Sequence, residues 1–143
     1  MIAEKIFHFL KGEWVLKREI NPHGSFEGTA KFALLDDMTL AYKEEGVLTL
    51  NAGNALDDVT KRYIYKLEGG GIAVYFNDGP NKGNLFHHLE FDNNGIAITT
   101  YDCPPDIYKT KMHLKFPDAF EIIYDVNGPK KQYRIKSYYE RAC

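Results

Sequence analysis

Apolar and polar residues alternate over most of the chain, and turn-forming residues interrupt the alternation about every 8 to 12 residues. A period of two places successive side chains on opposite faces of an extended strand. The interruptions are rich in glycine, proline and asparagine, as in Asn21-Pro22-His23-Gly24 and Asn127-Gly128-Pro129, which are the residues that tight turns require. This pattern is typical of antiparallel sheets. The predicted strands are 14–20, 26–35, 39–50, 59–67, 72–77, 85–91, 95–101, 107–116, 120–126 and 132–141.

Short turns between about ten strands leave no room for the helices that connect parallel strands. Residues 2–10 differ from the rest, because Ile2, Ile6, Phe9 and Leu10 recur at roughly helical spacing. We therefore predict an all-β protein: a single antiparallel up-and-down β-barrel of about ten strands, with a short N-terminal helical segment that plugs one end. A barrel also removes the sheet edges that such aromatic strands would expose to aggregation. A sandwich of two sheets is the alternative.

The length of 143 residues fits one domain, which we expect to span residues 1–143. The formal net charge of −2 gives no general attraction to nucleic acid or anionic lipid, and no apolar run approaches the ~20 residues that cross a bilayer. The apolar N-terminal stretch is broken by Glu4 and Lys5, so we expect no signal peptide and a cytoplasmic location. In that compartment Cys103 and Cys143 are expected to be free thiols, and no cluster has zinc-ligand spacing.

Alternation sorts each strand into two faces, and it assigns charges to the face that carries the apolar residues. Arg18, for example, shares its face with Trp14 and Leu16. Because burying an unpaired charge costs several kcal/mol or more, inward charges must be paired, hydrated or bound to a ligand. The alternatives are solvated charges at a barrel mouth and structural ion pairs. The predicted interior contains Arg18, Glu44, His87, Asp106, Lys131 and Arg141, with the hydroxyls of Tyr42, Tyr108, Tyr124, Tyr133 and Tyr139.

The segment Gly12-Glu13-Trp14 contains the single tryptophan of the chain, and Arg141 lies near the end of the last predicted strand. This resembles the Gly-x-Trp motif at the first strand of lipocalins and related calycins, the superfamily that also includes fatty-acid-binding-like barrels. There, an arginine of the last strand packs over the tryptophan and closes the barrel. The resemblance implies a calycin-like fold in which Trp14 and Arg141 are structural closure residues in cation–π contact. The chain departs from lipocalins because it lacks their middle motif.

Further positions run through the whole chain: Phe26, Gly28, Ala30, Phe32, Tyr42, Glu44, Gly46, Arg62, Tyr63, Phe86, His87, Leu89, Cys103, Asp106, Tyr108, Gly128, Pro129, Lys130, Lys131, Tyr133, Tyr139 and Arg141. Over roughly residues 9–141 these positions resemble an uncharacterised domain-of-unknown-function family of small bacterial-type β-barrel proteins. The resemblance implies a fold and a set of positions, but no activity. Many of the predicted inward residues belong to this set, which supports their assignment to the interior.

Three functions are compatible with these observations. The first is the binding of a small polar or anionic molecule inside the barrel, for which we predict the ligand-binding residues Arg18, Tyr42, Glu44, His87, Asp106, Tyr108, Tyr124, Lys131 and Tyr133. The second is a small barrel enzyme that uses His87 as a general acid or base, with Asp106, Tyr108 and Lys131 nearby. The third is a protein–protein interaction module with an outer surface that includes Tyr65, Tyr75 and Tyr138. The sequence identifies no cofactor or metal site and leaves open a homodimer.

Overall fold

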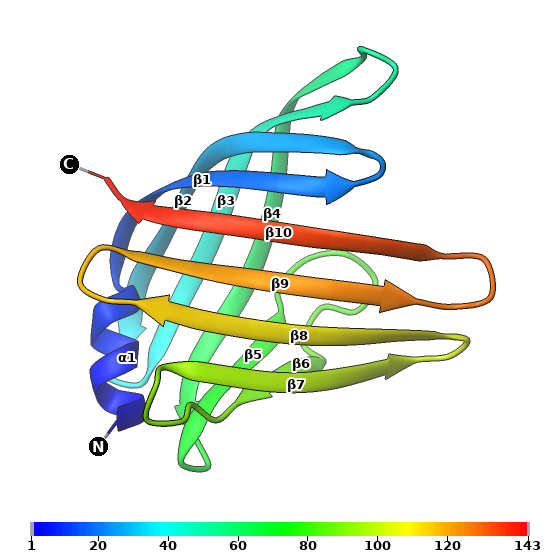
Figure 1. Ribbon diagram of the computed structural model, residues 1–143. Coiled ribbons are helices and arrows are strands. Elements are labelled where there is room, and N and C mark those ends of the chain that lie inside the picture. The colour runs from blue at the N-terminus through cyan, green and yellow to red at the C-terminus, as the bar shows by residue number, and fades with distance from the viewer. Residues whose placement is uncertain (1, 143) are drawn as a thin grey trace.

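The computed structural model describes residues 2–142, which form one helix and ten strands (Figure 1). The predicted helical segment and every predicted strand are present, with bounds that differ by a few residues. In chain order the elements are α1 (Ile2–Leu10), β1 (Gly12–Asn21), β2 (Gly24–Asp36), β3 (Thr39–Leu50), β4 (Ala55–Glu68), β5 (Gly71–Phe76), β6 (Leu85–Leu89), β7 (Ile96–Cys103), β8 (Asp106–Lys115), β9 (Ala119–Asn127) and β10 (Gln132–Arg141).

All ten strands belong to one antiparallel sheet with the order β6-β5-β4-β3-β2-β1-β10-β9-β8-β7. The first and last strands pair along their length, from Trp14 opposite Arg141 to Asn21 opposite Arg134. The two outermost strands, β6 and β7, come together without a hydrogen-bonded ladder, so the barrel is nearly closed with one seam. The predicted up-and-down barrel is thus confirmed, and a sandwich of two separate sheets is excluded because the ladder runs unbroken through all ten strands.

Helix α1 lies at one end of the barrel, on the left in Figure 1, which we call the helix end. The helix buries Ile6, Phe7 and Leu10 in the barrel core. The opposite end, which we call the open end, carries the turns between β1 and β2, β3 and β4, β7 and β8, and β9 and β10, with the longer connection of residues 77–84 between β5 and β6. Within residues 2–142, no helix has the length and apolar character needed to cross a membrane.

Arg141 joins the end of the last strand to the end of α1. Its guanidinium lies 4.0 Å from the centre of a Trp14 ring, and it donates hydrogen bonds to the carbonyl oxygens of Phe9 (2.7 Å) and Lys11 (2.9 Å). The Trp14 indole donates a third bond, of 2.9 Å, to the carbonyl of Leu10. Carbonyls at a helix C-terminus have no partner within the helix, so these two side chains both satisfy them and hold α1 in place.

The solid core occupies the half of the barrel next to α1. Trp14, Phe32 and Phe120 are buried there and pack against one another. Inward positions nearer the open end, such as Ile20 on β1 and Ile135 on β10, are only partly buried. The interior therefore changes from a packed core to a partly open space toward the open end.

Besides register shifts in the pairings of β2 with β3 and of β3 with β4, a bulge in β6 breaks the predicted alternation. In β6 the register against β5 shifts, so that His87 pairs with Val74 but Leu85 pairs with Tyr75. Phe86 is the extra residue of this bulge, and its ring stacks on that of His87 inside the barrel with centroids 3.6 Å apart. Alternation places Leu85, two residues from His87, on the same inward face, but Leu85 is 48% exposed. That assignment is wrong because a bulge turns consecutive side chains toward the same face.

Candidate ligand-binding cavity

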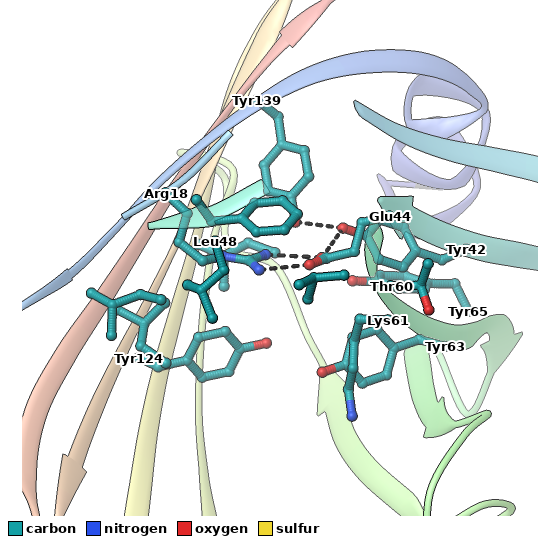
Figure 2. Close-up of a pocket in the computed structure, with 15 residues that line it drawn as sticks. Arg18, Tyr42, Glu44, Leu48, Thr60, Lys61, Tyr63, Tyr65, Tyr124 and Tyr139 are labelled. Carbon is teal, nitrogen blue, oxygen red and sulfur yellow. Dashed lines mark hydrogen bonds and ion pairs between the residues drawn. The ribbon is translucent and has the colours of Figure 1, made fainter. Parts of the chain in front are cut away.

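The partly open half of the barrel contains a cavity of about 290 Å³ (Figure 2). Six strands contribute to its wall: β1, β2, β3, β4, β9 and β10. Larger hollows elsewhere on the described residues are lined by outward-facing charged side chains such as Lys17, Glu27 and Lys136. The cavity is lined by Arg18, Ile20, Phe26, Tyr42, Glu44, Leu48, Val59, Thr60, Lys61, Tyr63, Tyr65, Ile122, Tyr124, Ile135 and Tyr139.

An ion pair between Arg18 and Glu44 crosses the cavity wall. The guanidinium donates two hydrogen bonds to the carboxylate, of 2.6 Å from Nη1 and 2.9 Å from Nη2, and a third of 2.7 Å from Nε to the hydroxyl of Ser137. Glu44 is 3% exposed, so its charge depends on this partner. Burial opposes the charge on Arg18, but the hydrogen bond to Glu44 and the charges around it raise the pKa of Arg18 well above its ordinary value.

Two tyrosines extend this pair into a network. The hydroxyl of Tyr42 donates to Glu44 over 2.6 Å, and the hydroxyl of Tyr139 lies 2.8 Å from that of Tyr42. Because the Tyr42 proton is used by Glu44, the Tyr139 hydroxyl is the donor in the second bond. Burial raises the pKa of Tyr139 to about 12 and raises that of Tyr42 well above its usual value. Both side chains are therefore neutral hydroxyls at physiological pH.

Strand register explains why these residues meet. Arg18 on β1 is directly opposite Ser137 on β10, and Tyr42 and Glu44 share the inward face of β3 because they are two residues apart. The contact between Arg18 and Glu44 spans the intervening strand β2. Arg18 pairs there with Phe26, whose ring centre is 5.2 Å from the guanidinium, Glu44 pairs with Ala30, and Gly28 lies between these two positions. Small residues on the middle strand leave room for the long arginine side chain to reach the carboxylate.

Tyr63, Tyr65 and Tyr124 complete the polar lining. Figure 2 shows the hydroxyls of Tyr63, from β4, and Tyr124, from β9, directed into the space between them, with no hydrogen bond joining either to another side chain drawn. Burial raises the pKa of all three tyrosines above the usual value. The cavity thus presents neutral hydroxyls, which can both donate and accept hydrogen bonds.

Lys61 stands at the edge of the cavity, on the same face of β4 as Tyr63. Its ammonium group is 3.0 Å from the carboxylate of Asp78 and 5.5 Å from the centre of the Tyr63 ring. The lysine side chain is 40% exposed. It is therefore a solvated charge with a carboxylate partner at the cavity entrance.

Of the predicted site residues, the structure brings Arg18, Tyr42, Glu44 and Tyr124 together around this cavity. Lys61 and Tyr63 were not among the predicted site residues, although their even spacing along β4 was a usable signal. Tyr65 was predicted to lie on an outer surface. That assignment is wrong. Tyr65 is two residues from Tyr63 and lies on the same inward face of β4, where it is 4% exposed and packs on Phe32 inside the barrel.

His87 is buried behind Tyr124 and does not line the cavity. Its ring is roughly parallel to that of Tyr124, with centroids 5.7 Å apart, and neither of its nitrogens has a hydrogen-bond partner among residues 2–142. Burial lowers the pKa of His87 to about 3, so the imidazole is neutral. The structure therefore does not bring His87 into hydrogen-bond contact with Asp106, Tyr108 or Lys131, the contacts that the enzyme hypothesis required.

The remaining predicted residues form a separate cluster at the open end. Lys131 pairs with Asp106 at 3.2 Å, and its side chain is 52% exposed. It lies in the turn before β10, where the alternation of the strand no longer applies. Burial and a hydrogen bond to Tyr133 raise the pKa of Tyr108 to about 12. Cys103 is an exposed free thiol at this end, whereas Cys143 lies outside the described residues.

The fold is similar to that of several solved β-barrels. A de novo designed fluorescence-activating β-barrel matches with a TM-score of 0.52 and 10% identity, over 94% of this chain and 95% of that chain. EF1p2_mFAP2b bound to DFHBI matches with a TM-score of 0.54 and 10% identity, over 98% of this chain and 99% of that chain. The redesigned β-barrel mFAP0 bound to DFHBI matches with a TM-score of 0.50 and 11% identity, over 93% and 99% of the two chains. These low identities establish likeness of fold alone.

No curated protein sequence matches this chain. A family model does match, over residues 10–141, a span that runs from the last residue of α1 to the last residue of β10. The matched span includes the whole cavity lining and both Trp14 and Arg141. The family resemblance seen in the sequence is thereby confirmed: the chain belongs to DUF6314, a family of unknown function.

Proposed function

We propose that this protein binds a small organic molecule in the cavity at the open end of its barrel. The observation that carries the proposal is a hollow that combines apolar walls with inward hydroxyls on facing strands. A protein interior normally packs to the density of an organic crystal, and strands rich in aromatic residues have the volume to fill it. A hollow with convergent polar groups is instead the usual form of a small-molecule site.

The size of the cavity limits the ligand. At about 290 Å³ it lies at the lower end of the ~300–1,000 Å³ that small-molecule pockets occupy. A long acyl chain or a peptide does not fit such a volume, whereas a molecule of one or two rings does. Two barrels of similar fold are bound to DFHBI, which supports ligand binding by a barrel of this kind.

The buried network supports the same proposal. The network fills inward positions that apolar side chains would fill at lower electrostatic cost. Its members are Arg18, Glu44, Tyr42 and Tyr139. Buried polar networks fix side chains in one geometry. Here that geometry forms one wall of the cavity, which is the arrangement needed for selective binding.

Native mass spectrometry of the protein purified from its own host tests the proposal, because a retained ligand adds a discrete mass. A matched pair of variants locates it: Leu48→Trp fills the cavity, whereas Val47→Trp, one residue away on β3, adds the same ring at a position that is 38% exposed. We expect the added mass in wild type and V47W and its loss in L48W. Absence of any added mass, together with no cavity-specific shifts in an NMR screen of small aromatic fragments, would overturn the proposal.

A further inference from the structure

We infer that the ligand is an uncharged aromatic compound with hydrogen-bonding groups at opposite ends, held between Tyr63 and Tyr124. This inference rests on the proposed function and specifies the chemistry of the ligand. It narrows the expectation of a small polar or anionic ligand to an uncharged one.

Every charged side chain among the described residues that line the cavity is paired with an opposite charge, so none is free to pair with an ionic ligand. Arg18 is paired with Glu44 through two hydrogen bonds, and Lys61 is paired with Asp78 at 3.0 Å. The tyrosines are neutral because burial raises their pKa values. A charged ligand would lose its water on entering this space and gain no uncompensated opposite charge in return.

Glu44 and Ser137 use three of the five N–H donors of Arg18, so an anion that took up the whole guanidinium would separate it from Glu44. The carboxylate, 3% exposed, would then keep Tyr42 as a hydrogen-bond donor but lose its counter-charge. A cation that recruited Glu44 would leave Arg18 unpaired in the same way. Removing one member of a buried pair is strongly unfavourable, so the resting pair disfavours both kinds of ion.

Aromatic side chains determine the shape that fits. Six aromatic rings line the cavity, those of Phe26, Tyr42, Tyr63, Tyr65, Tyr124 and Tyr139. Aromatic rings pack favourably against one another in offset-stacked and edge-to-face arrangements, which favours a ligand that is itself a ring.

Phe86 packs against the rings of Tyr63 and Tyr124 and so holds their hydroxyls in position. Its ring is parallel to that of Tyr124, at 4° with centroids 5.9 Å apart, and nearly parallel to that of Tyr63, at 21° with centroids 5.8 Å apart. The bulge in β6 brings Phe86 inward, so a local irregularity of the seam supports both tyrosines at once. With their rings fixed, the hydroxyls of Tyr63 and Tyr124 offer two hydrogen bonds from opposite walls to one flat ligand (Figure 2).

Three small probes that share one ring and differ in charge test this inference: 4-hydroxybenzamide is uncharged, 4-hydroxybenzoate is anionic and 4-(aminomethyl)phenol is cationic at neutral pH. Their dissociation constants are measured by NMR titration or calorimetry with wild-type protein. We expect the benzamide to bind at least about tenfold more tightly than either ion, since an unpaired charge is costly in this space.

Tyrosine variants test the position of the probe. Y63F and Y124F keep the rings and remove the hydroxyls, and we expect each to weaken benzamide binding by roughly three- to tenfold, the effect of one hydrogen bond. Y75F is the matched control, because the Tyr75 hydroxyl bonds to Glu68 away from the cavity and its loss should leave the dissociation constant unchanged.

The outcomes separate this inference from the proposed function. Tightest binding of the benzoate or of the cation would overturn the inference and leave small-molecule binding intact. The same holds if none of the probes binds while the protein from its host retains a ligand. Failure of the probes, the fragment screen and the retained mass together would overturn both.

Discussion

Arg18 and Glu44 form a bidentate ion pair across the cavity wall, with Nη1 2.6 Å from Oε2 and Nη2 2.9 Å from Oε1. The side chain of Arg18 is 17% exposed and that of Glu44 is 5% exposed. The two residues come from β1 and β3, so the pair links strands that are not neighbours in the sheet. It therefore determines both the electrostatics of the cavity and the positions of Tyr42 and Tyr139.

Breaking this pair from one side should destabilise the protein. Glu44→Gln leaves the guanidinium of Arg18 without its counter-charge, and we expect a loss of about 2–4 kcal/mol in the free energy of unfolding. The double variant Arg18→Met/Glu44→Met should lose less than the sum of its single variants, because it removes both charges. Urea denaturation of wild type, R18M, E44M and the double variant provides the double-mutant cycle, and E44Q is measured beside them. Equal stability of E44Q and wild type would mean that the pair is solvated and would contradict its role.

A second prediction concerns the contact between Arg141 and Trp14. Arg141→Met keeps the aliphatic stem but removes the cation over the indole and both hydrogen bonds to the end of α1, and we expect a loss of about 1–3 kcal/mol in unfolding free energy. Trp14 is the only tryptophan, so its fluorescence reports the transition without interference. Lys17→Met, on the outer face of β1, is the control. An identical denaturation midpoint for R141M and K17M would contradict a stabilising contact between Arg141 and Trp14.

Most of the fold was predictable because turn chemistry and alternation are local signals. Glycine, proline and asparagine marked nearly every turn. Alternation along each strand placed four cavity residues inside before any strand pairing was known: Arg18, Tyr42, Glu44 and Tyr124. Alternation shows on which face of the sheet a side chain lies, but not how far along the barrel axis it lies. For that reason Lys131, in a turn at the open end, was grouped with residues of the cavity although it is exposed.

The rest depended on non-local contacts. Arg18 was expected to bind a polar or anionic ligand, with a structural ion pair as the alternative, and only the spatial arrangement shows that its guanidinium is paired with Glu44. The bulge at Phe86 depends on the register between β5 and β6 and on the unpaired seam beside them, neither of which has a sequence signature. Apart from Lys61 and Tyr63, which alternation along β4 could have indicated, the parts of the site that sequence reasoning missed are those determined by contacts between strands.

Gly28 and Gly46 support a third prediction. They face each other in the pairing of β2 with β3, and a Cβ on Gly28 would overlap the carbonyl oxygen of Glu45 and lie 2.8 Å from the Cα of Gly46. Because the obstacle is backbone, no rotamer change relieves it, and Gly28→Ala should cost at least about 2 kcal/mol of unfolding free energy. Thr29→Ala, at the adjacent exposed position, is the control in the same urea titration. A G28A protein as stable as T29A would show that the strands separate easily here.

The fourth prediction is a loss of stability in mild acid that originates at His87. Burial lowers the pKa of His87 to about 3 in the folded protein, whereas an unfolded histidine titrates near ~6.5. The unfolded chain therefore takes up the proton first, so the contribution of His87 to stability is complete above about pH 6.5 and declines as the pH falls toward 3. Between about pH 7.5 and pH 5 this amounts to about 2 kcal/mol.

Urea unfolding over that pH range isolates the effect of His87, because other groups contribute to the pH dependence of every variant alike. His87→Leu should flatten the pH dependence of the unfolding free energy by about 2 kcal/mol, whatever its stability at neutral pH. His88→Gln, at the neighbouring part-exposed histidine that bonds to the carbonyl of Glu68, is the matched control. If H87L and wild type lost stability in parallel, His87 would have a hydrogen-bond partner in solution, and its ring would not be the isolated group seen behind Tyr124.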